Sequence, residues 1–217
     1  MTHSLRAESR VPSQDAAALL AVASRLAAAA ESSDEAASIL AESIVTLLSA
    51  EGCLVSSLED GYFRVDAAAG CLSPIRGERN RVDESLALRT LQEARVIVVN
   101  DVTDDAAINT PFHAELGIRQ VASAPLIAGG VAFGVLLAVN SGRGDFSDDD
   151  AVILQRVAEL GSPAVRNARL LERERRSARE ARALTDIVRH LNQSLEVERV
   201  FTLIAEHAAD LLQGAGA

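Results

Sequence analysis

The chain has 217 residues, of which 48% are hydrophobic, and carries a formal net charge of −10 at pH 7. This acidic balance disfavours a nucleic-acid-binding surface, and the length allows one well-packed core with extensions, or one complete domain and part of another. All 21 basic residues are arginine, which excludes sites that need a lysine, such as a Walker phosphate-binding loop or a Schiff-base enzyme.

The N-terminal segment 16–30 is rich in alanine and leucine. Arg25 interrupts this segment and acidic residues flank it, so it is neither apolar nor long enough to cross a bilayer. Only two cysteines occur, Cys53 and Cys71, and they suit a reducing compartment without a disulfide framework. We therefore expect a first helix in a cytoplasmic protein that has no membrane partner.

A β-hairpin is predicted next. The runs 53–58 and 62–69 favour strands, and Glu59-Asp60-Gly61 between them contains the Asp-Gly pair typical of tight turns. The following stretch, 70–81, contains glycine, proline and several charges, and therefore predicts a loop.

One helix and one buried strand are predicted after this loop. Residues 83–94 combine three leucines with helix-forming residues, and either Asp83 or Ser85 would cap the helix. Residues 96–99 form a continuous β-branched run, which is typical of a buried strand.

A second hairpin is predicted after a polar stretch and a short helix. The short helix, 111–116, has proline in its first turn. The runs 119–127 and 131–140 are then joined by Ala128-Gly129-Gly130, which predicts a tight connection between two strands. Together these elements predict an α+β fold, in which helices flank a central antiparallel sheet.

A long helix is predicted from residue 148 to about residue 191. Phe146-Ser147-Asp148-Asp149-Asp150 supplies a cap and places carboxylates at the positive end of the helix dipole. Proline inside a helix removes a hydrogen bond, so we expect the helix to be broken by a kink at Gly161-Ser162-Pro163.

Apolar residues recur at three- and four-residue steps in the second part of this helix, although Arg175 interrupts them. Mixed charges at 172–182 accompany the stripe. This pattern predicts a parallel homodimer through residues 164–191, supported by the first helix around residues 19–26. A lone solvated helix is the alternative. The stripe consists of Ala164, Ala168, Leu171, Ala178, Ala181, Leu184, Val188 and Leu191.

A weak internal repeat suggests the domain organisation. Leu40-Ala41-Glu42 aligns with Ile204-Ala205-Glu206, and each triplet precedes a pair of leucines. We interpret the repeat as two pairs of amphipathic helices, although chance similarity between such helices would look the same. The expected division is a complete domain at 1–172, a connector helix at 173–186, and the opening helices of a second, truncated domain at 187–217.

Three short motifs carry a family resemblance. They are Ala124-Pro125-Leu126 before the second hairpin turn, Gly134-Val135-Leu136 after it, and the Phe146–Asp150 helix start. With them the chain resembles the GAF family of small-molecule-sensing domains. The resemblance implies a non-catalytic sensor in a bacterial signalling protein, the first of a tandem pair, which would relay its state through a helical dimer linker to a C-terminal output domain.

The resemblance also implies where a ligand would bind. In GAF domains the pocket lies between the sheet and the segment before the last hairpin, here residues 100–117. A partly polar lining suits a small molecule held by a few hydrogen bonds, although a solvated polar loop would have the same composition. The residues that the resemblance places there are Asn109, Thr110, Phe112, His113, Arg119 and Ser123.

Haem is one possible cofactor, because the resemblance extends to haem-binding GAF sensors at Phe112-His113. In such sensors a histidine in this region is the proximal iron ligand, and neutral imidazole binds iron well. His113 would then be the metal-binding residue. Ala114-Glu115 replaces the Pro-Pro that follows the histidine in those sensors, so a histidine at the surface or the pocket rim is the alternative.

Two other ligand classes of the family lack support. Cyclic-nucleotide-binding GAF domains carry an Asn-Lys pair, and here Asn140 is followed by Ser141, so the characteristic ion pair cannot form. Covalent bilin attachment needs a cysteine in the pocket segment, and residues 100–117 contain none.

Catalysis is not expected either. The sequence contains no Gly-x-Ser-x-Gly, His-Glu-x-x-His or Cys-x-x-Cys motif, and its four histidines are scattered.

The interpretation that competes with a ligand-binding sensor is a GAF domain that only dimerises and spaces other domains, with side chains filling its pocket.

Overall fold

The structure, a computed structural model, describes residues 13–29, 32–81, 85–104 and 111–214. Its contacts divide the chain into two compact units, Met1–Leu170 and Leu171–Ala217. The first contains the sheet, and the described part of the second is a single stretch of helix. None of the helices in these ranges has a segment long and apolar enough to cross a membrane.

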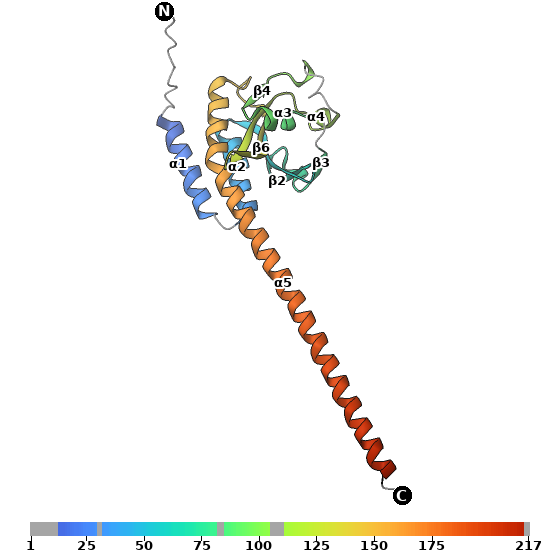
Figure 1. Cartoon of the computed structure of the whole chain (residues 1–217). Coiled ribbons are helices and arrows are strands. Elements are labelled where there is room, and N and C mark those ends of the chain that lie inside the picture. The colour runs from blue at the N-terminus through green and yellow to red at the C-terminus, as the bar shows by residue number, and fades with distance from the viewer. Residues whose placement is uncertain (1–12, 30–31, 82–84, 105–110, 215–217) are drawn as a thin grey trace, which may run out of the picture. The chain divides into compact units, whose positions relative to one another are not determined.

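The first unit is built on a six-stranded antiparallel sheet (Figure 1). Both predicted hairpins are present, and their longest strands pair with each other, so β1 and β6 form the centre of the sheet. The spatial order is β3-β2-β1-β6-β5-β4. The strands are β1 (Ala50–Glu59), β2 (Tyr62–Gly70), β3 (Arg79–Arg81), β4 (Ile97–Val99), β5 (Val121–Ala128) and β6 (Val131–Ser141).

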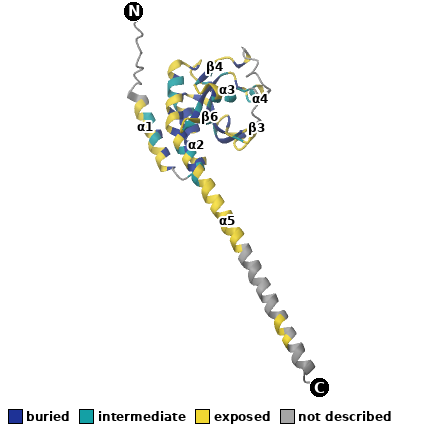
Figure 2. Ribbon diagram, in the orientation of Figure 1, coloured by how far each residue is buried: buried dark blue, intermediate teal, exposed yellow. Residues whose placement is uncertain are grey.

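One face of the sheet is covered by α2 (Ser33–Leu47) and the beginning of α5 (Asp148–Gly214). Leu40 and Ile44 of α2 are fully buried in this core, as is Leu154 of α5. Gly161 lets α5 approach α2 closely, because a methyl group there would overlap the side chain of Leu40. Figure 2 shows the buried side of both helices.

A smaller apolar cluster covers the opposite face, together with α3 (Leu86–Glu93), which packs against β5 and β6. The short helix α4 (Pro111–Glu115) precedes β5 in the chain. Ser85 caps α3 by accepting a 3.3 Å hydrogen bond from the Leu88 amide, whereas Asp83 lies outside the described residues. The predicted loop 70–81 also contains a 3-10 turn (Ser73–Ile75) and the edge strand β3. The buried members of the cluster are Leu54, Val65, Leu72, Ile75, Leu86, Ile97, Val102, Ile118, Val121 and Val139.

The predicted cap of α5 is confirmed and forms a reciprocal capping box. Ser147 Oγ accepts from the Asp150 amide at 3.2 Å, and Asp150 Oδ2 accepts from the Ser147 amide at 2.9 Å. Arg143 adds a 2.9 Å ion pair to Asp150. The acidic start of α5 is therefore a structural cap.

The predicted break at residues 161–163 does not occur, because α5 runs through Pro163 as one helix to Gly214. The same helix also includes residues 187–214, where the opening helices of a second domain are predicted. Burial on both sides of the proline, at Ala158 and Val165, fixes the helix to the sheet and offsets the lost hydrogen bond.

The first helix, α1 (Ser13–Ala28), is joined to α2 by an Arg25–Glu42 ion pair of 2.7 Å.

Candidate functional site

The predicted ligand residues occupy different environments. Asn109 and Thr110 lie outside the described residues, and of Phe112 only the backbone position in α4 is described. His113 is half-buried in α4, and its carbonyl accepts a 2.8 Å hydrogen bond from the Ile118 amide. Of the two remaining predicted residues, Arg119 lies two positions before β5 and Ser123 lies within it.

Arg119 and Ser123 differ sharply in exposure. The Arg119 side chain is 74% exposed, and its Nη2 lies 3.6 Å from Glu51 Oε1. Arg119 is therefore at the surface of the domain. Ser123 is fully buried, and its hydroxyl accepts a 2.9 Å hydrogen bond from Thr90 of α3. The predicted set is therefore spread from the surface to the interior, and Thr90 is a buried polar neighbour that sequence analysis missed.

Asparagines anchor both ends of the segment 100–117. At its start, Asn100 exchanges two hydrogen bonds with the backbone of Phe146, of 2.9 and 3.0 Å, which ties the segment to the beginning of α5. At its end, Asn140 contacts the backbone on both sides of Ile118. The two ends of the segment are thus tied to the sheet and to the residues that begin α5.

Asn140 is the more extensively bonded of the two. Its side-chain oxygen accepts from the amides of Arg119 (2.8 Å) and Gln120 (3.2 Å). Its side-chain nitrogen donates to Glu51 Oε2 (2.7 Å) and to the Gly117 carbonyl (3.0 Å). Asn140 also has a left-handed backbone, with φ of 51°. A buried asparagine that uses both of its polar groups in this way fixes one loop geometry.

A small cavity lies on the other side of the sheet, where β5 approaches α5. Its volume is about 70 Å³. Ligand pockets typically occupy roughly 300–1,000 Å³, so this cavity is too small for a metabolite. It is lined by Ala94, Arg95, Val96, Ala124, Pro125, Ile127, Gln155, Ala158, Glu159 and Ser162.

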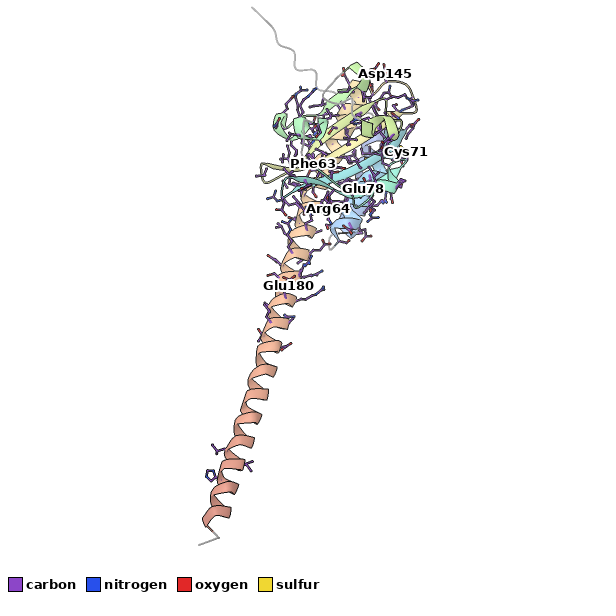
Figure 3. All side chains as sticks on the ribbon, turned by 90° about the vertical axis from the view of Figure 1, so that its right-hand side faces the viewer. Phe63, Arg64, Cys71, Glu78, Asp145 and Glu180 are labelled. Carbon is purple, nitrogen blue, oxygen red and sulfur yellow. The ribbon has the colours of Figure 1, made fainter. Side chains whose placement is uncertain are left out.

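The two thiols are poorly suited to nucleophilic chemistry. Burial raises the pKa of Cys53 far above its ordinary value. Cys71 is exposed (Figure 3), and partial desolvation together with the nearby carboxylate of Glu51 raises its pKa as well. Since the thiolate is the reactive form, both cysteines remain protonated at neutral pH.

Comparison with known proteins gives a consistent family. A family model described as "GAF domain" matches residues 30–166. This range includes the whole sheet, α2 and α5 as far as Arg166. The match therefore covers more than half of the chain and includes both anchored ends of the segment 100–117.

Several solved structures share the fold at low sequence identity. The GAF domain of an Acinetobacter phosphoenolpyruvate-protein phosphotransferase is similar with a TM-score of 0.63 and 13% identity, covering 74% of this chain and 98% of that one. Residues 122 to 287 of a methyl-accepting chemotaxis protein are similar with a TM-score of 0.60 and 20% identity, and the match covers 69% of this chain and 98% of that one. Free methionine-R-sulfoxide reductase from Neisseria meningitidis, in complex with its substrate, is similar with a TM-score of 0.59 and 15% identity. The match covers 74% of this chain and 95% of that one. At these identities the likeness shows the fold alone.

Proposed function

Because this chain belongs to the GAF domain family, we propose that it is a non-catalytic sensor module that binds a small molecule. GAF domains are sensory and regulatory modules of signalling proteins. The observation that carries the proposal is the anchoring of segment 100–117 by Asn100 and Asn140. A segment held at both ends can vary in between to fit a ligand while the sheet stays unchanged.

The proposed site lies between this segment and β5. His113 of α4 and the buried Ser123–Thr90 pair supply polar groups next to an apolar cluster, which is the mixture that small-molecule sites use. Asn109, Thr110, Phe112 and Arg119 complete the proposed set. The protonated thiols support a binding role over catalysis, although the fold itself also occurs in an enzyme.

A thermal-shift screen tests ligand binding. A specific ligand at one hundred times its Kd should stabilise the protein by about 2.7 kcal/mol, which for a domain of this size is a rise in Tm of roughly 5–10 °C. Metabolites, nucleotides and hemin form the panel. Ser123→Ala should abolish the shift, whereas Arg176→Gln, which changes an exposed pair on α5, should leave it intact.

Hemin needs a separate measurement, because its binding is visible directly. A Soret band in the wild type that disappears in His113→Ala would assign the iron to that histidine, and identical spectra would reject the assignment. If nothing in the panel shifts Tm, the ligand-free role in dimerisation and spacing replaces the sensor.

We further propose that the module is a parallel homodimer that relays its state through α5 to an output domain. The described residues 172–186 of α5 are all exposed in the single chain, including Leu184, which is 64% exposed (Figure 2). Within the first unit, Leu20 of α1 is 73% exposed and lies beside a groove shared with Leu160 of α5. A second copy would cover the exposed apolar side chains of each unit.

Replacing both Leu171 and Leu184 with aspartate should give monomers. Burying a charge in a helical seam costs several kcal/mol, so dimerisation should weaken more than about a hundredfold. Light scattering across a concentration series measures the mass, and circular dichroism should show that the core still melts cooperatively. Aspartate at Arg176, whose side chain is 82% exposed, is the control and should leave the mass unchanged. A wild-type monomer at high concentration would refute the dimer.

A further inference from the structure

Two β-bulges interrupt the sheet. The register of β1 against β2 shifts after Val55, which leaves Asp66 as an extra residue on β2. The register of β5 against β6 shifts after Leu126, which leaves Phe133 as an extra residue on β6. A bulge redirects the side chain that it carries, and here each extra residue meets an arginine of α5.

Arg169 meets the first bulge in a nearly buried ionic cluster. Its Nη2 lies 3.2 Å from Asp66 Oδ1 and 2.8 Å from Glu59 Oε1. The Arg169 side chain is only 11% exposed, and that of Asp66 only 4%. Arg64, labelled in Figure 3, adds a second cation 2.9 Å from the same Asp66 oxygen. Two guanidinium groups and two carboxylates thus meet at the contact between α5 and the β1–β2 hairpin.

Arg166 meets the second bulge. Its guanidinium carbon lies 5.6 Å from the centre of the Phe133 ring, and its Nη1 donates to the Ala128 carbonyl at 3.2 Å. One turn earlier, Ser162 Oγ accepts from the Ile127 amide at 3.0 Å. Residues 162, 166 and 169 share one helix face at steps of four and three, so α5 contacts both hairpins through a single polar row.

The ionic part of this contact is incompletely satisfied. Asp66 Oδ2 and Ser57 Oγ are buried and make no hydrogen bond of 3.5 Å or shorter in the described part of the chain, although the Ser57 hydroxyl is near enough to the Asp66 carboxyl to lower its pKa. The pKa of Asp66 is raised, because burial penalises its carboxylate more than the attraction of Arg169 and Arg64 offsets. The contribution of Asp66 to stability therefore falls as pH rises through its folded-state pKa. Such a contact is specific in geometry but only weakly favourable in net energy.

We propose that Arg166 and Arg169, with their partners Phe133, Asp66 and Glu59, form a releasable clasp, and that its opening is the step by which the sheet changes the state of α5. The clasp is well placed for this role. Among the residues of α5 whose burial is described, the last fully buried apolar side chain is Ala168, and those after Leu171 are exposed. The end of the helix in the first unit is thus held mainly by polar contacts, which can open without unfolding the core.

Hydrogen–deuterium exchange on the full ligand-free chain tests the clasp. In Arg169→Gln the carboxylates of Asp66 and Glu59 lose their buried partner, so the amides of residues 166–170 should exchange roughly tenfold faster or more. The amides of residues 151–158 should keep their wild-type rates. Adding Asp66→Asn removes one of the two carboxylates that have lost Arg169, so the double variant should exchange more slowly at 166–170 than Arg169→Gln alone.

Arg176→Gln is the matched control. Like Arg169, Arg176 pairs with a glutamate, here Glu180 of the same helix, but its side chain is 82% exposed. It should leave residues 166–170 unchanged. Equal exchange in Arg169→Gln and wild type would overturn the clasp. So would faster exchange by the same factor in β1 and β6, because Arg169 would then only stabilise the fold. The inference rests on the proposed sensor role, but no ligand enters this experiment, so its outcome and that of the ligand screen are independent.

Discussion

Replacing Gly134 with alanine is expected to destabilise the domain by about 3 kcal/mol or more, because it overpacks the centre of the sheet. A methyl group there would overlap the backbone carbonyl of Ser56 and lie 3.2 Å from Ser57 Cα. Both atoms belong to β1, which pairs with β2 on one side and β6 on the other. Neither can move without breaking the central ladder, so urea unfolding of Gly134→Ala should show a much lower midpoint.

Gly129→Ala is the matched control for that experiment. Gly129 lies in the β5–β6 turn with φ of +61°, and nothing lies within 4 Å of an added methyl group. Alanine there meets only backbone strain, which costs about 1–2 kcal/mol. A midpoint for Gly134→Ala at or above that of Gly129→Ala would show that the sheet accommodates the methyl group.

Replacing Asn140 with alanine should cost about 3 kcal/mol or more. Four hydrogen bonds are lost, including one to the Glu51 carboxylate, and each contributes about 0.5–3 kcal/mol. Alanine would also have to adopt the left-handed backbone of this position. Chemical denaturation gives the stability, and exchange at residues 113–120 should accelerate because the end of the proposed binding segment is released.

Asn140→Gly separates the two causes. Glycine adopts a φ of 51° without strain, so this variant loses only the side-chain hydrogen bonds. It should be about 1 kcal/mol more stable than the alanine variant but still well below the wild type. Wild-type stability of Asn140→Gly would mean that these hydrogen bonds fix nothing.

The parts of the fold that sequence predicts are those specified by local chemistry. The Asp-Gly and Gly-Gly pairs mark the two hairpin turns, and Ser147 with its aspartates marks the start of α5. These signals depend on residues close in the chain. Gly134 was recognised only as part of a family pattern, and the structure supplies its physical reason, which is the close approach of β1.

The remaining features depend on contacts that local patterns do not encode. Pro163 predicted a break in α5, but packing against the sheet on both sides keeps the helix continuous. No local pattern predicts the ion pair of Arg169, because its partner Asp66 lies 103 positions away. Ser123 was placed correctly on a strand, but its pairing with Thr90 depends on how α3 docks. The ligand residues stay a prediction, since Asn109 and Thr110 lie outside the described part.

The order of the strands has a consequence for aggregation. The edge strands, β3 and β4, have three residues each, whereas the strands between them have eight to eleven. Each of these two strands therefore offers an incoming chain only a few free backbone groups, and β3 also presents Arg79 and Arg81. Short edge strands, charged in the case of β3, discourage the strand-by-strand addition that leads to amyloid. The sheet can thus remain apolar on both faces without recruiting further copies through its edges, which leaves helix surfaces as the route to controlled assembly.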